Sequence, residues 1–83
     1  MKKGDYMVLT KLLSNEDGII RYLYQPEKDG EAGILLYNRE NDIPEIEKLA
    51  ENDIKSTFYR DHVFSMIRKN INNLPSERLL MWY

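Results

Sequence analysis

The chain has 83 residues, a net charge of −2, 42% hydrophobic and 31% charged residues, no cysteine, and a single histidine, His62. This length provides room for one small domain, residues 1–83, and excludes folds with separate cofactor and substrate lobes. Disulfides, thiolate metal sites and multi-histidine metal clusters are also excluded, and we expect no cofactor and no metal.

Charge is distributed unevenly along the chain. Residues 40–53 are mostly acidic, whereas residues 54–83 carry more basic than acidic side chains. Two solvated surfaces of opposite sign that attract one another within the fold explain this pattern best. The sharper alternative is a weak basic strip for an acidic partner. Because the net charge is slightly negative, no cationic field favours non-specific binding of nucleic acid, and we do not expect a nucleic-acid partner.

The sequence also predicts where the protein is found. No apolar run approaches the roughly 18 to 20 residues that are needed to span a bilayer, so no membrane association is expected. Met1 is followed by two lysines, Gly4 and Asp5, and Lys11 interrupts the next apolar stretch. This pattern is not typical of a secretory signal, and we expect a cytoplasmic protein.

Three segments in the first half are predicted to be strands, at residues 6–13, 19–25 and 33–38. The polar cluster at residues 14–18 predicts a hairpin loop in which Gly18 supplies a positive φ, and Pro26 ends the second strand. Residues 27–31 form a second polar turn with its own Asp-Gly pair. Because consecutive strands with short connections normally pair antiparallel, we predict a β-meander.

Residues 39–53 are compatible with two structures. Asp42 and Glu45 fit a capping box, and apolar residues recur at helical spacing after them, so a short helix is possible. Against this, residues 39–42 fit a hairpin loop, and Pro44 is tolerated at the start of an edge strand. We favour a fourth, edge strand at residues 43–50, where alternating acidic residues would discourage edge-to-edge aggregation.

The clearest element is a helix over residues 57–72. Ser56 or Thr57 can serve as its N-cap, and an apolar stripe with steps of three and four follows. Asparagines and Pro75 mark its end near Asn72. The apolar segment at residues 79–83 is either a short strand or an extended arm. The predicted fold is therefore α+β, a three- or four-stranded antiparallel meander packed on one C-terminal helix.

Both faces of the predicted sheet are apolar. Successive side chains of a strand point to opposite faces of the sheet, and in each predicted strand both sets include large apolar or aromatic residues. A single helix can cover only one of the two faces. The second face needs either the C-terminal segment or a second copy of the protein, and we predict a homodimer. The candidate interface residues are Tyr22, Tyr24, Tyr37, Trp82 and Tyr83. Half-exposed tyrosines on a monomer are the simpler alternative.

The candidate catalytic groups have ordinary structural explanations. His62 belongs to the one residue type whose unperturbed pKa lies near neutrality, but the neighbouring Asp61 points to a different helix face and does not orient it. The serines fit caps, turns or helix surface, and no nucleophile elbow, EF-hand or phosphate-binding loop is present. We therefore predict no catalytic, cofactor-binding or metal-binding residue.

The function that the sequence favours is a non-enzymatic protein-interaction or regulatory module that self-associates, with an unknown protein partner. One alternative is a domain that stacks single-stranded nucleic acid on the sheet tyrosines. The other is a small hydrolase or ligand-binding protein that uses His62 in a pocket with a carboxylate or a serine.

Overall fold

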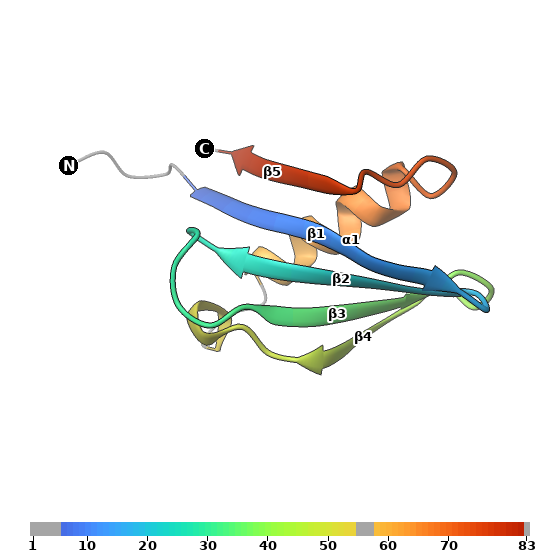
Figure 1. Cartoon of the computed structure of the whole chain (residues 1–83), viewed down its shortest axis with the longest axis horizontal. Helices are drawn as coiled ribbons and strands as arrows, with labels where there is room; N and C mark the ends of the chain where they lie inside the picture. The colour runs from blue at the N-terminus through green and yellow to red at the C-terminus, as the bar shows by residue number, and fades with distance from the viewer. Residues whose placement is uncertain (1–5, 55–57, 83) are drawn as a thin grey trace.

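The computed structural model describes residues 6–54 and 58–82, with only the backbone of Trp82 (Figure 1). The elements in chain order are β1 (Tyr6–Glu16), β2 (Ile19–Pro26), β3 (Gly33–Asn38), β4 (Ile43–Lys48), the 3-10 helix η1 (Glu51–Asp53), α1 (Phe58–Lys69) and β5 (Glu77–Trp82).

The strands form one sheet in the order β4-β3-β2-β1-β5, and every neighbouring pair is antiparallel. The first four strands follow one another as a meander, and β5 returns after α1 to pair with β1. The predicted α+β class and antiparallel meander are confirmed. Residues 43–48 form an edge strand, as favoured, and not a helix.

The β1–β2 turn is tighter than the sequence predicted. Ser14, Asn15 and Glu16 belong to β1 and pair with β2, so the connection contains only Asp17 and Gly18. Their φ values are 55° and 80°, and positive φ at both central residues produces the two-residue turn that matches the twist of a hairpin. A register shift between Leu12 and Ser14 lets the longer β1 stay paired with β2.

Glycine is required at the start of β3. A Cβ atom on Gly33 would lie 2.4 Å from the backbone nitrogen of Ala50, 2.5 Å from the carbonyl oxygen of Lys48 and 2.5 Å from a ring carbon of Tyr24. The chain after β4 therefore crosses directly over Gly33. This close approach brings η1 against β2, where the 3-10 helix closes one end of the core.

The helix α1 covers one face of the sheet. The buried positions alternate along β2 and β3, and the buried helix residues are Val63, Phe64, Met66 and Ile67. Between the two layers lie the strand side chains Val8, Ile20, Tyr22, Tyr24, Leu35 and Tyr37. The predicted stripe on the helix is thus the face that packs on the sheet.

The helix is shorter at its C-terminal end than predicted. It ends at Lys69, and the side-chain amide of Asn70 donates to the carbonyl oxygen of Met66 over 2.8 Å. Such a bond competes with the backbone hydrogen bonds of a continuing helix. Arg39 donates to the carbonyl oxygen of Ile71 over 3.1 Å, which ties the following turn to the β3–β4 connection. The predicted N-caps, Ser56 and Thr57, lie outside the described residues.

The other face of the sheet is not covered by any described element. Figure 1 views the molecule from this side, with all five strands in front and α1 behind them. The C-terminal segment, which could have covered this face as an arm, extends the sheet as β5 instead. Among residues 6–54 and 58–82, no helix has both the length and the apolar character that a membrane crossing requires.

Candidate functional site

The three predicted interface tyrosines are in the core, which corrects their assignment. Tyr22 and Tyr24 are fully buried and Tyr37 is 5% exposed. Their side chains lie on the face that α1 covers, so they cannot meet a partner or stack unpaired bases in this conformation. Tyr22 donates to the carbonyl oxygen of Pro75 over 2.5 Å, which anchors the α1–β5 connection to the sheet. This arrangement removes the main support for nucleic-acid binding through the sheet.

The two remaining candidates are at the C-terminus. The backbone of Trp82 pairs with Tyr6 at the end of β5, and its side chain and Tyr83 lie outside the described residues.

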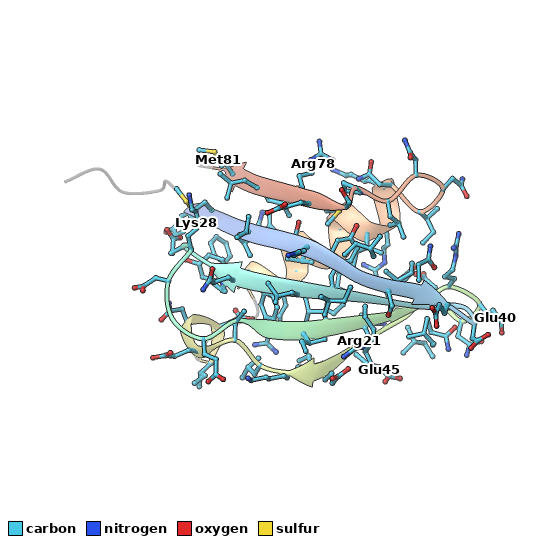
Figure 2. The ribbon with its side chains drawn as sticks, in the orientation of Figure 1. Arg21, Lys28, Glu40, Glu45, Arg78 and Met81 are labelled. Carbon is cyan, nitrogen blue, oxygen red and sulfur yellow. The ribbon has the colours of Figure 1, made fainter. Side chains whose placement is uncertain are left out.

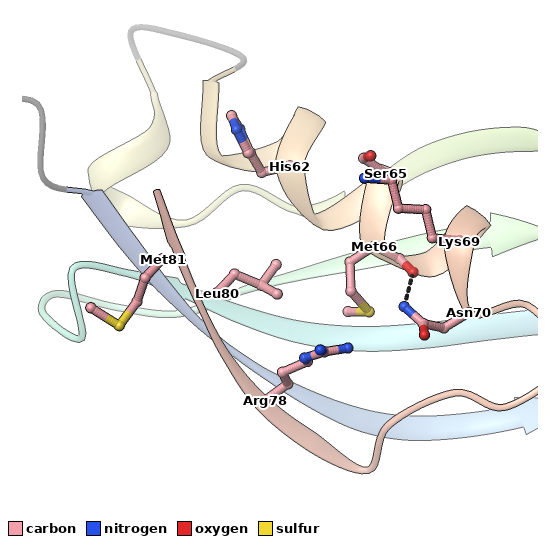
Figure 3. A pocket seen from close by; sticks show the side chains of 8 residues that line it. All are labelled: His62, Ser65, Met66, Lys69, Asn70, Arg78, Leu80 and Met81. Carbon is pink, nitrogen blue, oxygen red and sulfur yellow. Dashed lines mark hydrogen bonds between the residues drawn. The ribbon is translucent and has the colours of Figure 1, made fainter. Parts of the chain in front are cut away.

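A groove of about 370 Å³ separates α1 from β5 (Figure 3). Its helix side carries residues at steps of three and four, and its strand side carries three residues of β5. The lining residues are His62, Ser65, Met66, Lys69, Asn70, Arg78, Leu80 and Met81. Figure 3 shows Arg78 and Leu80 projecting from β5 toward the helix, and Met81 pointing to the opposite side of the strand.

The groove has an apolar floor and a basic rim. Met66 is 5% exposed and Leu80 is partly buried against the core, whereas Lys69 and Arg78 are exposed. Among the described residues, no carboxylate lines the groove, and neither Lys69 nor Arg78 forms an ion pair. The described lining of the groove therefore carries two basic side chains and no acidic partner for them.

The groove is lined by a histidine and a serine that are not hydrogen-bonded to each other in the described part of the chain. His62 lies on it, but its Nδ1 is 3.1 Å from the carbonyl oxygen of Phe58 and its ring meets the Phe58 ring edge-on at 5.4 Å. Ser65 lines the same groove, yet no hydrogen bond joins it to His62 in the described residues. A serine nucleophile needs a base within hydrogen-bond reach and a group that orients this base.

The outer edge of β5 offers unpaired backbone groups. The N–H of Leu12 donates to the carbonyl oxygen of Ser76 over 2.8 Å, and pairs in an antiparallel ladder alternate between bonded and non-bonded. Arg78 and Leu80 therefore bond inward to β1, while the N–H and C=O groups of Glu77, Leu79 and Met81 point outward. In the described part of the chain no strand lies beyond β5.

The open face of the sheet is a second candidate surface. Its apolar side chains come from all five strands: Met7, Leu9, Ile19, Leu23, Ile34, Leu36, Ile43, Leu79 and Met81. At the sides of this face, Ile43 is 46%, Leu79 40% and Met81 59% exposed. Figure 2 shows Arg21 and Glu45 toward the β4 side, and Met81 at the end of β5.

Charged groups on the open face partly neutralise one another. Arg21 donates from Nε and from a terminal nitrogen to the two carboxylate oxygens of Glu47, over 3.1 and 2.9 Å. This hydrogen-bonded pair raises the pKa of Arg21 and lowers that of Glu47. Lys11 lies directly opposite Glu77. The open face therefore has no strong charge of either sign.

The sequence singled out His62 but not the other groove residues. A helical wheel places His62, Ser65 and Lys69 on one stripe, and alternation places Arg78 and Leu80 on one side of a strand. The pairing of β5 with β1, which brings that strand beside the helix, could not be predicted from these local patterns.

Comparisons of this chain with protein-family models, with curated proteins and with solved structures give no match.

Proposed function

We propose that this protein is a non-enzymatic interaction module that self-associates through the open face of its sheet. The observation that carries the proposal is the apolar character of this face together with the position of the C-terminal segment. Because residues 79–82 belong to the strand β5, their backbone extends the sheet and does not cross the face. A sheet that is apolar on both sides normally has both sides covered. A cytoplasmic setting stays a prediction from the sequence.

The size of the open face suits a dimer. Five strands at a spacing of about 4.8 Å are about 24 Å wide, and strands of about seven residues are about 24 Å long, which gives a flat area of about 600 Å². Side-chain relief increases this area toward the roughly 800 Å² that each partner contributes to a standard interface.

The chemistry of the face supports a second copy as its occupant. A two-fold contact requires a patch that complements itself, and this face combines apolar rows with charges of both signs. Leu23 lies at its centre, on the middle strand, between Lys11 of β1 and Ile34 of β3. Two such sheets can stack face to face at about 10 Å, with their apolar rows interleaved.

The proposal is tested by measuring the mass in solution. Sedimentation equilibrium at tens of micromolar is expected to give twice the chain mass of 9.9 kDa. The variant Leu23→Glu places a carboxylate at the centre of the interface, where Lys11 can pair with it in the monomer. We expect this variant to sediment as a folded monomer, because a dimer would bury the new charges.

Two further variants make the result specific. Leu79→Lys changes a side chain that is 40% exposed and is expected to weaken the dimer without unfolding the monomer. Ile54→Glu is the matched control, since Ile54 is 64% exposed and follows η1, away from the sheet. A wild-type mass of one chain at about 100 μM, or equal effects of Leu23→Glu and Ile54→Glu, would refute the proposal.

A further inference from the structure

The groove between α1 and β5 has a use that differs from self-association. We propose that it binds an extended, acidic peptide segment of a partner protein, which adds to the outer edge of β5 as a sixth strand. Main-chain hydrogen bonds to the strand edge would hold the segment, and the groove would select its side chains. This mode of recognition needs a free edge, a neighbouring groove and a chemical preference.

The free edge is provided by alternate residues of β5. Leu12 and Ser76 form a hydrogen-bonded pair, and such pairs alternate with non-bonded pairs along an antiparallel ladder. The N–H and C=O groups that point outward therefore belong to Glu77, Leu79 and Met81. These three residues span about 13 Å, which is enough to pair with a segment of about five residues. Exposed strand edges of this kind are the sites at which other chains add.

The opposite edge of the sheet is protected in a way that β5 is not. β4 contains Pro44, which has no N–H to donate, and the carboxylates of Glu45 and Glu47. Every residue of β4 is exposed. β5 carries an apolar run at Leu79 to Met81 beside α1. The β5 edge therefore combines outward-facing backbone groups with a lined groove.

The groove specifies the side chains that enter it. Alternate residues of an added strand point toward α1, where they meet the apolar floor of Met66 and Leu80 and the basic groups of Lys69 and Arg78. An apolar residue followed two places later by Asp or Glu matches this arrangement. Arg78 is suited to a carboxylate, because its guanidinium can donate two parallel hydrogen bonds.

Charge argues for a foreign segment over a second copy of this chain. A second β5 would bring another Arg78 and another Lys69 toward a groove whose described lining already carries two basic side chains. A second β4 would offer Pro44 without a donor, and its Glu47 is already held by Arg21. That contact would also be head-to-tail and would not close. An acidic segment from another protein would bring no like charge to the groove and could donate its main-chain N–H groups to β5.

The test uses the full chain and a defined peptide probe. The probe is a blocked, fluorescently labelled peptide of about seven residues in which Val and Glu stand two places apart between threonines. Fluorescence anisotropy is expected to show saturable binding with a Kd below about 1 mM that weakens with added salt. In amide-resolved NMR spectra the largest shifts are expected at Glu77, Leu79 and Met81, the residues with outward N–H groups.

Paired controls separate strand addition from general attraction. A peptide with Lys in place of Glu removes the charge match, and a peptide N-methylated at alternate amides removes the main-chain donors; each is expected to bind at least about tenfold more weakly. The variants Lys69→Gln and Arg78→Gln together are expected to weaken binding by at least about tenfold. Lys11→Gln is the matched control, since Lys11 is a surface cation on the open face.

Several results would overturn the inference. These are no binding at millimolar probe, equal affinity for the Lys-containing peptide, or equal effects of Lys11→Gln and the groove variants. Shifts confined to Leu9 and Leu23 would place the peptide on the open face and would also count against it. Because Lys69 and Arg78 lie away from the proposed dimer face, the mass of the groove variants tests self-association separately.

Discussion

The hydroxyl group of Tyr24 donates a hydrogen bond of 2.8 Å to Oδ2 of Asp53, joining the central strand β2 to η1 inside the core. The same hydroxyl oxygen accepts the N–H of Ala50 over 3.1 Å. Asp53 is 1% exposed, and its Oδ2 also accepts a hydrogen bond of 2.8 Å from Nε of Arg60. One phenol thus hydrogen-bonds both a buried carboxylate oxygen and a buried amide, whereas the other carboxylate oxygen of Asp53, Oδ1, is buried with no hydrogen-bond partner among the described residues.

The first prediction concerns this hydroxyl group. Tyr24→Phe keeps the ring but leaves the Ala50 amide without its acceptor and Asp53 with one donor fewer. We expect the free energy of unfolding to fall by about 2 kcal/mol or more, measured by urea denaturation. Tyr37→Phe is the control, because no hydrogen bond of the Tyr37 hydroxyl is found in the described residues. Equal losses for both variants would contradict the role assigned to Tyr24.

The second prediction concerns the ion pair of Arg60 and Asp53. The side chain of Asp53 is fully buried and that of Arg60 is 15% exposed. Removing one partner leaves a buried charge uncompensated, so Arg60→Gln is expected to lower the stability by about 3 kcal/mol. Arg21→Gln is the matched control: its pair with Glu47 is exposed at the sheet surface, and we expect a much smaller loss. If urea denaturation gave comparable losses of unfolding free energy for the two variants, the larger contribution assigned to the buried pair would be contradicted.

The strands and turns could be predicted because their signals are local. Alternation and the Asp17-Gly18 and Asp29-Gly30 pairs identify β1, β2 and β3 without knowledge of the rest of the chain. The face that the helix covers is not a local property. Tyr22 and Tyr24 lie on one face and Ile19 and Leu23 on the other, and both sets are apolar. Nothing in β2 itself indicates which of them α1 buries.

The groove could not be predicted for a related reason. It exists because β5 pairs with β1, and the two segments are separated by most of the chain. A segment of Leu, Leu, Met and Trp is compatible with a strand, an arm or a dimer contact. The carboxyl-terminal basic bias was visible in the sequence, but the separation of Lys69 and Arg78 from the acidic segment required the fold. By contrast, Arg60 and Arg68 do pair with Asp53 and Asp42.

The third prediction contrasts two glycines. Gly33→Ala places a Cβ within 2.5 Å of two backbone atoms, which cannot move aside as a flexible side chain can. We expect a loss of about 3 kcal/mol or an unfolded chain, followed by circular dichroism during urea denaturation. Gly18→Ala has ordinary contacts of 3.7 Å or more but a φ of +80°, so only conformational strain of about 1 kcal/mol opposes it. A milder effect at Gly33 than at Gly18 would be inconsistent with the close crossing.

The last prediction concerns stability at alkaline pH. Burial is the largest cause that raises the pKa of Tyr24 above its ordinary value near 10, and the hydrogen bond to Asp53 acts in the same direction. Burial also raises the pKa of Tyr59, helped by its hydrogen bond to Glu27, and that of Tyr22. All three phenols therefore hold their protons more firmly in the folded protein than in the unfolded chain.

The sign of the effect follows from proton binding. Above about pH 10 the unfolded chain releases phenolic protons that the folded protein retains, so the free energy of unfolding decreases as the pH rises. Between pH 7 and 9 we expect these three tyrosines to have little effect on the urea midpoint of unfolding. Above about pH 10 we expect the midpoint to fall steeply. Tyr24→Phe is expected to make this fall shallower, although the variant is less stable at neutral pH. Midpoints that stay level to about pH 11.5, or phenolic absorbance that titrates completely near pH 10 in the folded protein, would show that these tyrosines are not protected by burial.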